Sequence, residues 1–218
     1  MILPPGLRSA DFALLHTAQT ATMKAHFEPI VDQFQEFLND LDPIKDVQQE
    51  RGIRPKGRAF ARPARYFRQH WWFSHEGGRS EAQWNVGMYP CHLRFGIGFI
   101  VSGGGFADRD KIHRALSRFS TEVRKREAHD PGCFQRAGIE VEIHDGNGVV
   151  VVPAAQWPSV VEHWILIGAI LRSGFGTSHT GCGSKDDSAI LADPQLLRNA
   201  IQNCASVLWP VWLASRAP

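Results

Sequence analysis

The chain has 218 residues, of which 43% are hydrophobic, and its formal net charge is +2. This length and composition allow a hydrophobic core without disulfides or metals, and they fit one large domain that we expect to span residues 1–218. No run approaches the roughly 18 apolar residues of a membrane-spanning helix, and the first residues lack the pattern of a secretion signal, so we expect a cytoplasmic protein that does not bind a membrane.

The N-terminal segment, residues 9–41, has apolar residues at three- and four-residue spacing, which predicts helix. Pro29 lies inside this segment, and we expect it to divide the segment into two helices or to kink one helix. Residues 42–64 are rich in proline, glycine and arginine and predict an extended arm. The apolar positions of the helical pattern are Phe12, Leu15, Phe27, Ile30, Val31, Phe34, Leu38 and Leu41.

From Tyr66 onward the apolar period changes to two, which predicts strands. We expect one strand to about Phe73, a turn at 75–79, a second strand over 81–89 and a third strand after Pro90. The third strand has the clearest alternation in the chain. Together the three segments predict an antiparallel meander with one apolar face. The apolar positions of the third strand are Leu93, Phe95, Ile97, Phe99 and Val101.

A helix is expected over residues 107–128, and a second β-hairpin follows it. In the hairpin, apolar and polar residues alternate over 139–144, and the turn residues Asp-Gly-Asn-Gly at 145–148 precede a run of valines at 149–152. The buried stripe of the helix is predicted to consist of Ile112, Leu116, Phe119 and Val123.

The C-terminal third begins with residues 159–171, which are almost wholly apolar and fit either a buried strand or a buried helix; we favour a strand. Residues 172–188 are rich in glycine and are expected to form a mobile loop. A last helix is expected to begin with Asp193 as N-cap and Pro194 as its first residue. Its predicted packing face consists of Leu197, Ile201, Cys204 and Leu208.

These elements predict an α+β fold, in which an antiparallel β-meander and a second hairpin pack against N-terminal, central and C-terminal helices. The four cysteines, at 91, 133, 182 and 204, are far apart and never form a Cys-x-x-Cys pair. We therefore expect reduced and mostly buried thiols, without a zinc site or a disulfide framework. A P-loop, an H-E-x-x-H motif, a G-x-S-x-G motif and a dinucleotide fingerprint are all absent from the sequence.

The arm carries the highest density of positive charge in the chain, with seven basic residues and no acidic residue between positions 51 and 68. Guanidinium groups pair with phosphate oxygens, and neighbouring aromatic rings stack on exposed bases, so this composition is typical of nucleic-acid binding. The alternative is a solvated loop that balances the acidic helix before it. The basic residues are Arg51, Arg54, Lys56, Arg58, Arg62, Arg65 and Arg68.

Aromatic residues accompany this arm, and Tyr66, Trp71, Trp72 and Trp84 are candidates for stacking on bases. Their alternative role is in the core. Because Trp71 and Trp72 are adjacent on a strand, they point to opposite faces, and at most one of them faces the same core.

A second basic set lies on the helix over 107–128, where Arg114 and Arg118 are candidates for phosphate contacts. A solvated outer face of the helix is the alternative. The complete set is Lys111, Arg114, Arg118, Arg124, Lys125 and Arg126.

For catalysis, the strand over 139–144 places Glu140, Glu142 and His144 on one face, where two carboxylates and an imidazole are suitable ligands for a divalent cation such as Mg²⁺. No Lys follows in the acid-x-Lys arrangement of many metal-dependent nucleases, and the alternative is that this is the solvent-exposed face of the hairpin.

The sequence thus predicts a nucleic-acid-binding protein, with DNA favoured over RNA. The alternatives are a nuclease or phosphodiesterase that depends on a divalent metal, and a protein-interaction module such as an inhibitor or an assembly subunit. The protein is also a candidate homodimer, because a small meander leaves strand edges unpaired.

Overall fold

The computed structural model describes residues 2–17, 20–42, 71–75, 82–101, 109–144, 149–158, 161, 163–174 and 185–216. The helices are α1 (Ser9–Thr17), α2 (Thr20–Asp40), α4 (Arg109–His129), α5 (Cys133–Arg136), α6 (Ser188–Ala192) and α7 (Pro194–Ser215), with a 3-10 turn, η1, at Ala154–Gln156. The strands are β1 (Trp71–His75), β2 (Gln83–Tyr89), β3 (His92–Ile100), β4 (Ile139–His144), β5 (Val149–Pro153) and β6 (Trp164–Arg172).

The strands form one six-stranded sheet in the order β1-β2-β3-β6-β4-β5, and every neighbouring pair is antiparallel. The predicted α+β class, the meander and the second hairpin are therefore confirmed. The apolar run within 159–171 is a strand, as favoured, and it joins the meander to the hairpin by pairing with both β3 and β4. Among the described helices, none is both long enough and apolar enough to cross a membrane.

Helix α2 continues through Pro29, so the expected division at this residue is wrong, and the alternative, a kink of one helix, stays a prediction. In the N-terminal segment, α1 ends at Thr17 and α2 begins at Thr20. Phe27, Val31 and Phe34 flank Pro29 and are fully buried. Their burial explains the continuity of the helix, because the packing of an apolar face outweighs the one backbone hydrogen bond that proline removes.

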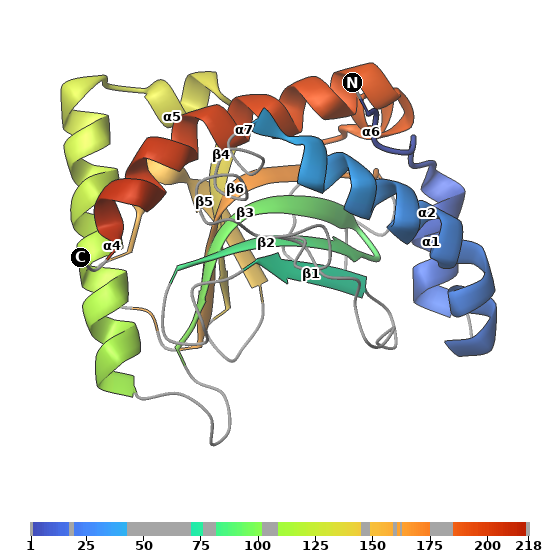
Figure 1. Ribbon diagram of the computed structural model, residues 1–218, viewed down its shortest axis with the longest axis horizontal. Coiled ribbons are helices and arrows are strands. Elements are labelled where there is room, and N and C mark those ends of the chain that lie inside the picture. The colour runs from blue at the N-terminus through green and yellow to red at the C-terminus, as the bar shows by residue number, and fades with distance from the viewer. Residues whose placement is uncertain are drawn as a thin grey trace.

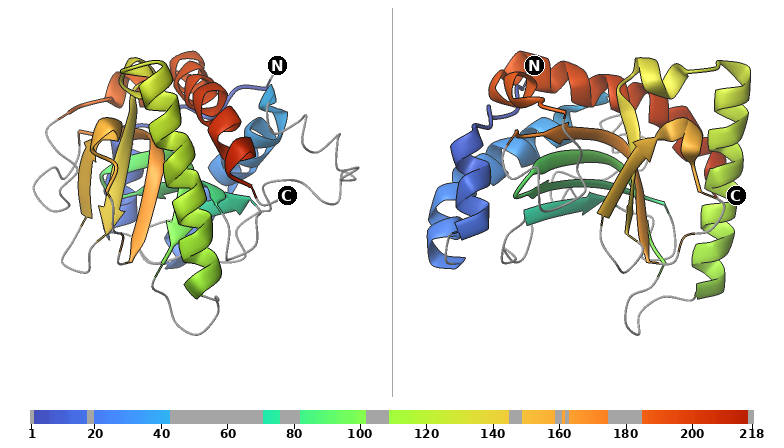
Figure 2. Two further views of the ribbon diagram at one scale, coloured as in Figure 1. Left: turned by 90° about the vertical axis from the view of Figure 1, so that its left-hand side faces the viewer. Right: turned by 180° about the vertical axis from the view of Figure 1, so that it is seen from behind.

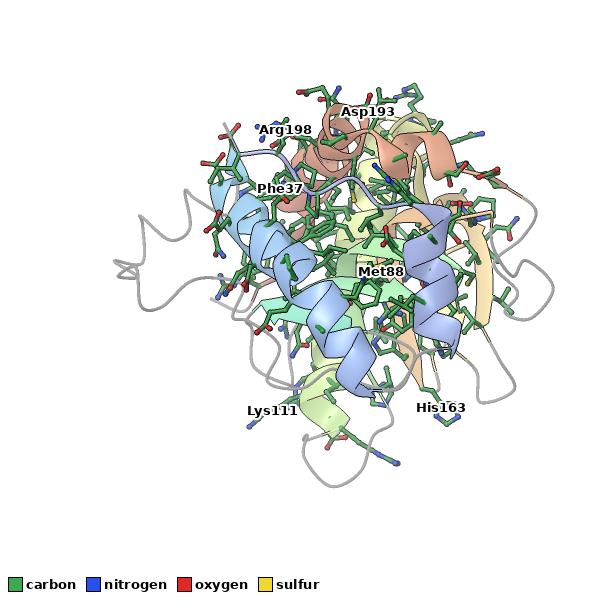
Figure 3. All side chains as sticks on the ribbon, turned by 90° about the vertical axis from the view of Figure 1, so that its right-hand side faces the viewer. Phe37, Met88, Lys111, His163, Asp193 and Arg198 are labelled. Atoms are coloured by element: carbon green, nitrogen blue, oxygen red, sulfur yellow. The ribbon has the colours of Figure 1, made fainter. Side chains whose placement is uncertain are left out.

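One face of the sheet packs against the helices and forms a single hydrophobic cluster with them. Figure 1 shows α7 and α2 lying across this side of the curved sheet, with α4 standing at one end, and Figure 2 shows α1 and α2 at the opposite end. In the view of Figure 3, Met88 of β2 appears between α1 and α2. The predicted stripes of α4 and α7 are buried here, and Asp193 caps α7 by accepting hydrogen bonds from two backbone N–H groups.

Among the residues whose side chains the structure describes, the opposite face of the sheet contributes none to this cluster. Because side chains alternate along a strand and paired residues share a face, it carries Asn85, Arg94, Glu142 and Trp164, and we call it the polar face. Three glycines lie at its centre. Gly96 of β3 pairs with Gly168 of β6, and Gly98 follows in the next row.

The glycine pair allows the two central strands to approach closely. A Cβ atom on Gly96 would lie 2.6 Å from the Cα atom of Gly168 and would overlap the carbonyl oxygen of Ile167. Any larger side chain would therefore force the backbones apart. The glycines leave gaps on the polar face beside the buried side chains of Leu166 and Ile170, and longer side chains from neighbouring positions lie over these gaps.

Candidate functional site

A buried carboxylate, that of Glu142 on β4, is the centre of the polar face. Its Oε1 atom accepts a hydrogen bond from Nη1 of Arg94 at 2.7 Å and lies 2.9 Å from Nε2 of His144, while Oε2 lies 3.1 Å from Nε2 of His92. Glu142 is only 1% exposed and Arg94 5%. The three basic partners come from β3 and β4, which are brought to either side of β6 by the strand order.

These partners determine the charge state of Glu142. Burial alone would raise the pKa of its carboxyl group, but the Arg94 guanidinium, His92 and the hydrogen bond from His144 outweigh burial and hold the pKa well below its usual range. Glu142 is therefore ionised at neutral pH and neutralises Arg94. Burial also raises the pKa of the nearby Tyr89 hydroxyl, so this phenol stays protonated.

The guanidinium of Arg94 lies between two aromatic rings as well. Its Cζ atom is 4.3 Å from the ring centre of Tyr89 and 3.9 Å from that of Trp164. These distances are within the range of cation–π attraction. The two rings approach from opposite ends of the strands across the glycine rows, and a Cβ atom on Gly98 would lie 3.5 Å from the indole of Trp164.

A second ion pair, between buried Arg172 and partly buried Glu140, lies further along the same face. Arg172 of β6 donates to both carboxylate oxygens of Glu140, with 3.1 Å between Nη2 and Oε1. The backbone N–H of Arg172 in turn donates to Asp187, at 3.0 Å. Each of the two glutamates on β4 is thus neutralised by an arginine from another strand.

A pocket of about 80 Å³ opens on the polar face beside Arg94. Its described lining combines two side-chain amides, two aromatic rings, the guanidinium of Arg94 and an exposed isoleucine. Such a mixture of flat apolar walls and a few fixed polar groups is typical of small-molecule sites. The lining residues are Gln83, Asn85, Tyr89, Arg94, Gly98, Ile100 and Trp164.

Two polar groups in this pocket have hydrogen-bonding capacity left over. Arg94 uses Nε for Asn85 Oδ1, at 3.3 Å, and Nη1 for Glu142. Within the described part of the chain, Arg94 Nη2 and Asn85 Nδ2 donate to no protein atom. Both residues are more than nine-tenths buried and both line the pocket, so their spare N–H groups are among the polar groups that a ligand would meet there, beside Gln83 and Tyr89.

The predicted catalytic residues occupy the strand face that the sequence assigned to them. However, the face is not the solvent-exposed surface that was considered as an alternative, because Glu142 is buried and Glu140 and His144 are partly buried. The residues form ion pairs with arginines and histidine. Across the described segments, no group of three or more His, Cys, Asp or Glu side chains is arranged to hold a metal ion.

The residues predicted to contact nucleic acid belong to different segments of the chain. The arm from Arg51 to Arg68, with Tyr66, lies outside the described residues, and so does Cys182. Trp71 and Trp72 lie in β1, where their backbones pair with Met88 and Gly87. The basic arm residues outside the described part of the chain are Arg51, Arg54, Lys56, Arg58, Arg62, Arg65 and Arg68.

Trp84 is fully buried among Phe95, Trp209 and Trp212, so the prediction that it stacks on a base is wrong. The apolar alternation of β2 places it on the core face. On α4, Arg114 is exposed, whereas Arg118 is half-buried and donates through Nε to the carbonyl of Ser215 at 3.0 Å.

Sequence reasoning missed Arg94, Asn85, Tyr89 and Trp164 as site residues. One signal was present, namely an arginine in a strand where the positions alternating with the apolar residues 93, 95, 97 and 99 otherwise hold a histidine, two glycines and an isoleucine. The partner on β4 was not foreseeable, because it depends on the insertion of β6 between β3 and β4.

No protein-family model matches the chain, and no curated protein matches it either.

Proposed function

We propose that the protein binds nucleic acid, with DNA as the favoured ligand, and that α4 supplies contacts to phosphate groups. The observation that carries this proposal is the charge of α4, whose 21 residues include seven Lys and Arg against three Asp and Glu. Each basic side chain that neutralises a phosphate releases condensed counterions, which favours binding.

Four of the seven basic residues of α4 lie along one stripe of the helix. Lys111, Arg114, Arg118 and Lys125 follow one another at spacings of three, four and seven residues, which places them along one stripe of the helix. The buried stripe faces the other way. Within the described residues, Arg114 has no ion pair, so its charge is available to a ligand.

The position of α4 also suits a long ligand. It stands at the end of the molecule, and its N-terminal part extends beyond α7 (Figure 1), while Figure 3 shows Lys111 at the outer end. A helix of 21 residues is about 31 Å long. The major groove of B-DNA admits an α-helix, whereas the deep and narrow major groove of double-stranded RNA does not, which favours DNA.

The test is a titration of labelled duplex DNA over a series of salt concentrations. Wild type is expected to show a steep fall of log K with log salt. The triple variant Lys111→Gln, Arg114→Gln, Lys125→Gln should lower the slope by roughly 2 to 3, since each lost phosphate contact contributes about 0.9.

A matched control is Arg8→Gln, which removes an exposed charge near α1, at the end of the molecule opposite α4. This control should keep the wild-type slope. A flat salt response of the wild type, or a triple variant with unchanged slope, would refute the proposal.

The nuclease alternative gains no support from the site. A divalent cation attracted to Glu140 or Glu142 would have to displace Arg172 or Arg94, each of which is almost completely buried against its carboxylate.

A further inference from the structure

We propose that the pocket beside Arg94 binds a single nucleobase that presents two adjacent hydrogen-bond acceptors, and that this base is cytosine. This inference rests on the proposed function, nucleic-acid binding, but it concerns a different surface from α4. It states what the polar face recognises.

The donors of the pocket define the edge of the ligand. Asn85 Nδ2 and Arg94 Nη2 offer N–H groups without a protein partner in the described segments, and both side chains are held in place, Arg94 by Glu142 and two rings, Asn85 by Arg94. Both side chains line the pocket, so a ligand acceptor can reach these N–H groups there. Two fixed donors therefore select a ligand with two neighbouring acceptors.

The walls define the shape of the ligand. Trp164 is half-buried and its indole is the flat wall that lines the pocket, Gly98 leaves room above β3, and Ile100 is 47% exposed at the rim. The ring of Tyr89 is covered by Arg94 and stacks on His92, so Tyr89 borders the pocket without offering a stacking face. A flat indole wall favours stacking of a planar ring, as in proteins that hold an extruded or single-stranded base. At about 80 Å³ the pocket is far smaller than the roughly 300 Å³ at the lower limit of drug-sized sites, which favours one six-membered ring over a purine.

Among the pyrimidines, cytosine fits the donors. On its Watson–Crick edge the O2 and N3 atoms are both acceptors and are adjacent, whereas in thymine and uracil N3 carries a hydrogen and would face a donor. Guanine also has two neighbouring acceptors, O6 and N7, but on a larger ring system. The chemistry of the pocket thus ranks cytosine first and makes guanine the competitor to be tested.

The direct experiment is a titration of the wild-type protein with the four deoxynucleoside monophosphates, followed by NMR at the indole N–H of Trp164. This resonance is assigned by its loss in Trp164→Phe. We expect dCMP to shift it at millimolar concentration and dTMP to require at least fivefold more. Equal shifts with dCMP and dTMP, a larger shift with dGMP, or no shift with any of the four would overturn the inference.

A variant separates the pocket from the phosphate contacts. Asn85→Ala should lower the affinity for oligo-dC roughly tenfold, to the level of oligo-dT, because one selective hydrogen bond is lost. The salt slope should stay unchanged, since no phosphate contact is removed. The matched control is Asn199→Ala, at an exposed position of α7, which should leave both quantities unchanged.

The outcomes keep the two proposals apart. A steep salt slope combined with equal affinity for oligo-dC and oligo-dT in the wild type overturns the base assignment while phosphate binding stands. A selective shift of Trp164 by dCMP without any salt-dependent DNA binding supports the pocket and refutes the role of α4. Urea unfolding of Asn85→Ala establishes that a loss of binding is not a loss of fold.

Discussion

Replacement of Glu142 by Gln tests whether the buried carboxylate is the group that holds the polar face together. The substitution keeps the shape of the side chain and removes its charge. Arg94, at 5% exposure, would then retain its positive charge without the carboxylate that lies 2.7 Å from Nη1. Its contacts with the rings of Tyr89 and Trp164 would remain.

The expected loss in the free energy of unfolding follows from the usual effect of breaking a buried ion pair. Removal of one partner typically destabilises a protein by roughly 3 to 5 kcal/mol, because the other charge stays buried. Glutamine can still accept a hydrogen bond, and the ring contacts persist, so we expect about 3 kcal/mol. The double variant Arg94→Met, Glu142→Leu removes both charges and should cost less than Glu142→Gln alone.

The assay is urea unfolding followed by tryptophan fluorescence, with the free energy of unfolding extrapolated to water. If Glu142→Gln costs less than about 1 kcal/mol, or if the double variant is as unstable as the sum of the single variants, the network does not stabilise the fold as described.

The contribution of Glu142 to the free energy of unfolding should fall as the pH is lowered. The pKa of Glu142 in the folded protein is well below its ordinary value of 4.5, owing to Arg94, His92 and His144 and in spite of burial. Its ionisation therefore stabilises the fold above that ordinary value, and the stabilisation is lost as the pH falls through the folded pKa. The difference between wild type and Glu142→Gln should accordingly shrink below about pH 4.5.

Three further predictions concern the fold. Gly96→Ala should destabilise the protein by about 3 kcal/mol or more in urea unfolding, since its Cβ would collide with the backbone of β6. Gly98→Ala should destabilise it clearly less, because the nearest backbone atom would lie 3.3 Å from the new Cβ, and equal effects of the two variants would contradict this packing. Asp193→Ala should cost about 1 kcal/mol through loss of the α7 N-cap, and an unchanged midpoint would argue against the cap. Burial raises the pKa of the Cys204 thiol to about 12, so mass spectrometry should find it unmodified by iodoacetamide in the native protein and modified in urea.

The strands and helices were largely readable from the sequence because each has a strong apolar period. The alternation in β3 and β4, the stripe of α4 and the Asp193-Pro194 start of α7 are local patterns, and local patterns are what periodicity reports. The predicted division at Pro29 was wrong because it considered only the local effect of proline on a helix. The burial of Phe27 and Phe34, which keeps the helix continuous, is a tertiary effect.

The site was harder to predict, since alternation distinguishes polar from apolar positions but not exposed from buried ones. Arg94 and Glu142 both occupy polar positions, and only the strand order reveals that they meet across β6. The role of Gly96 and Gly168 is likewise invisible in sequence, because either glycine alone is equally typical of a turn or a bulge.

The strand order has a consequence for the synthesis of the chain. The meander and the hairpin are each made from neighbouring segments, but they join only through β6, which follows both in the chain. Until residues 164–172 have left the ribosome, β3 and β4 each present an unpaired edge, and such edges are prone to pair with other chains. Ribosome-bound chains that stop before Trp164 should therefore depend on chaperones, and the dependence should end once β6 is available.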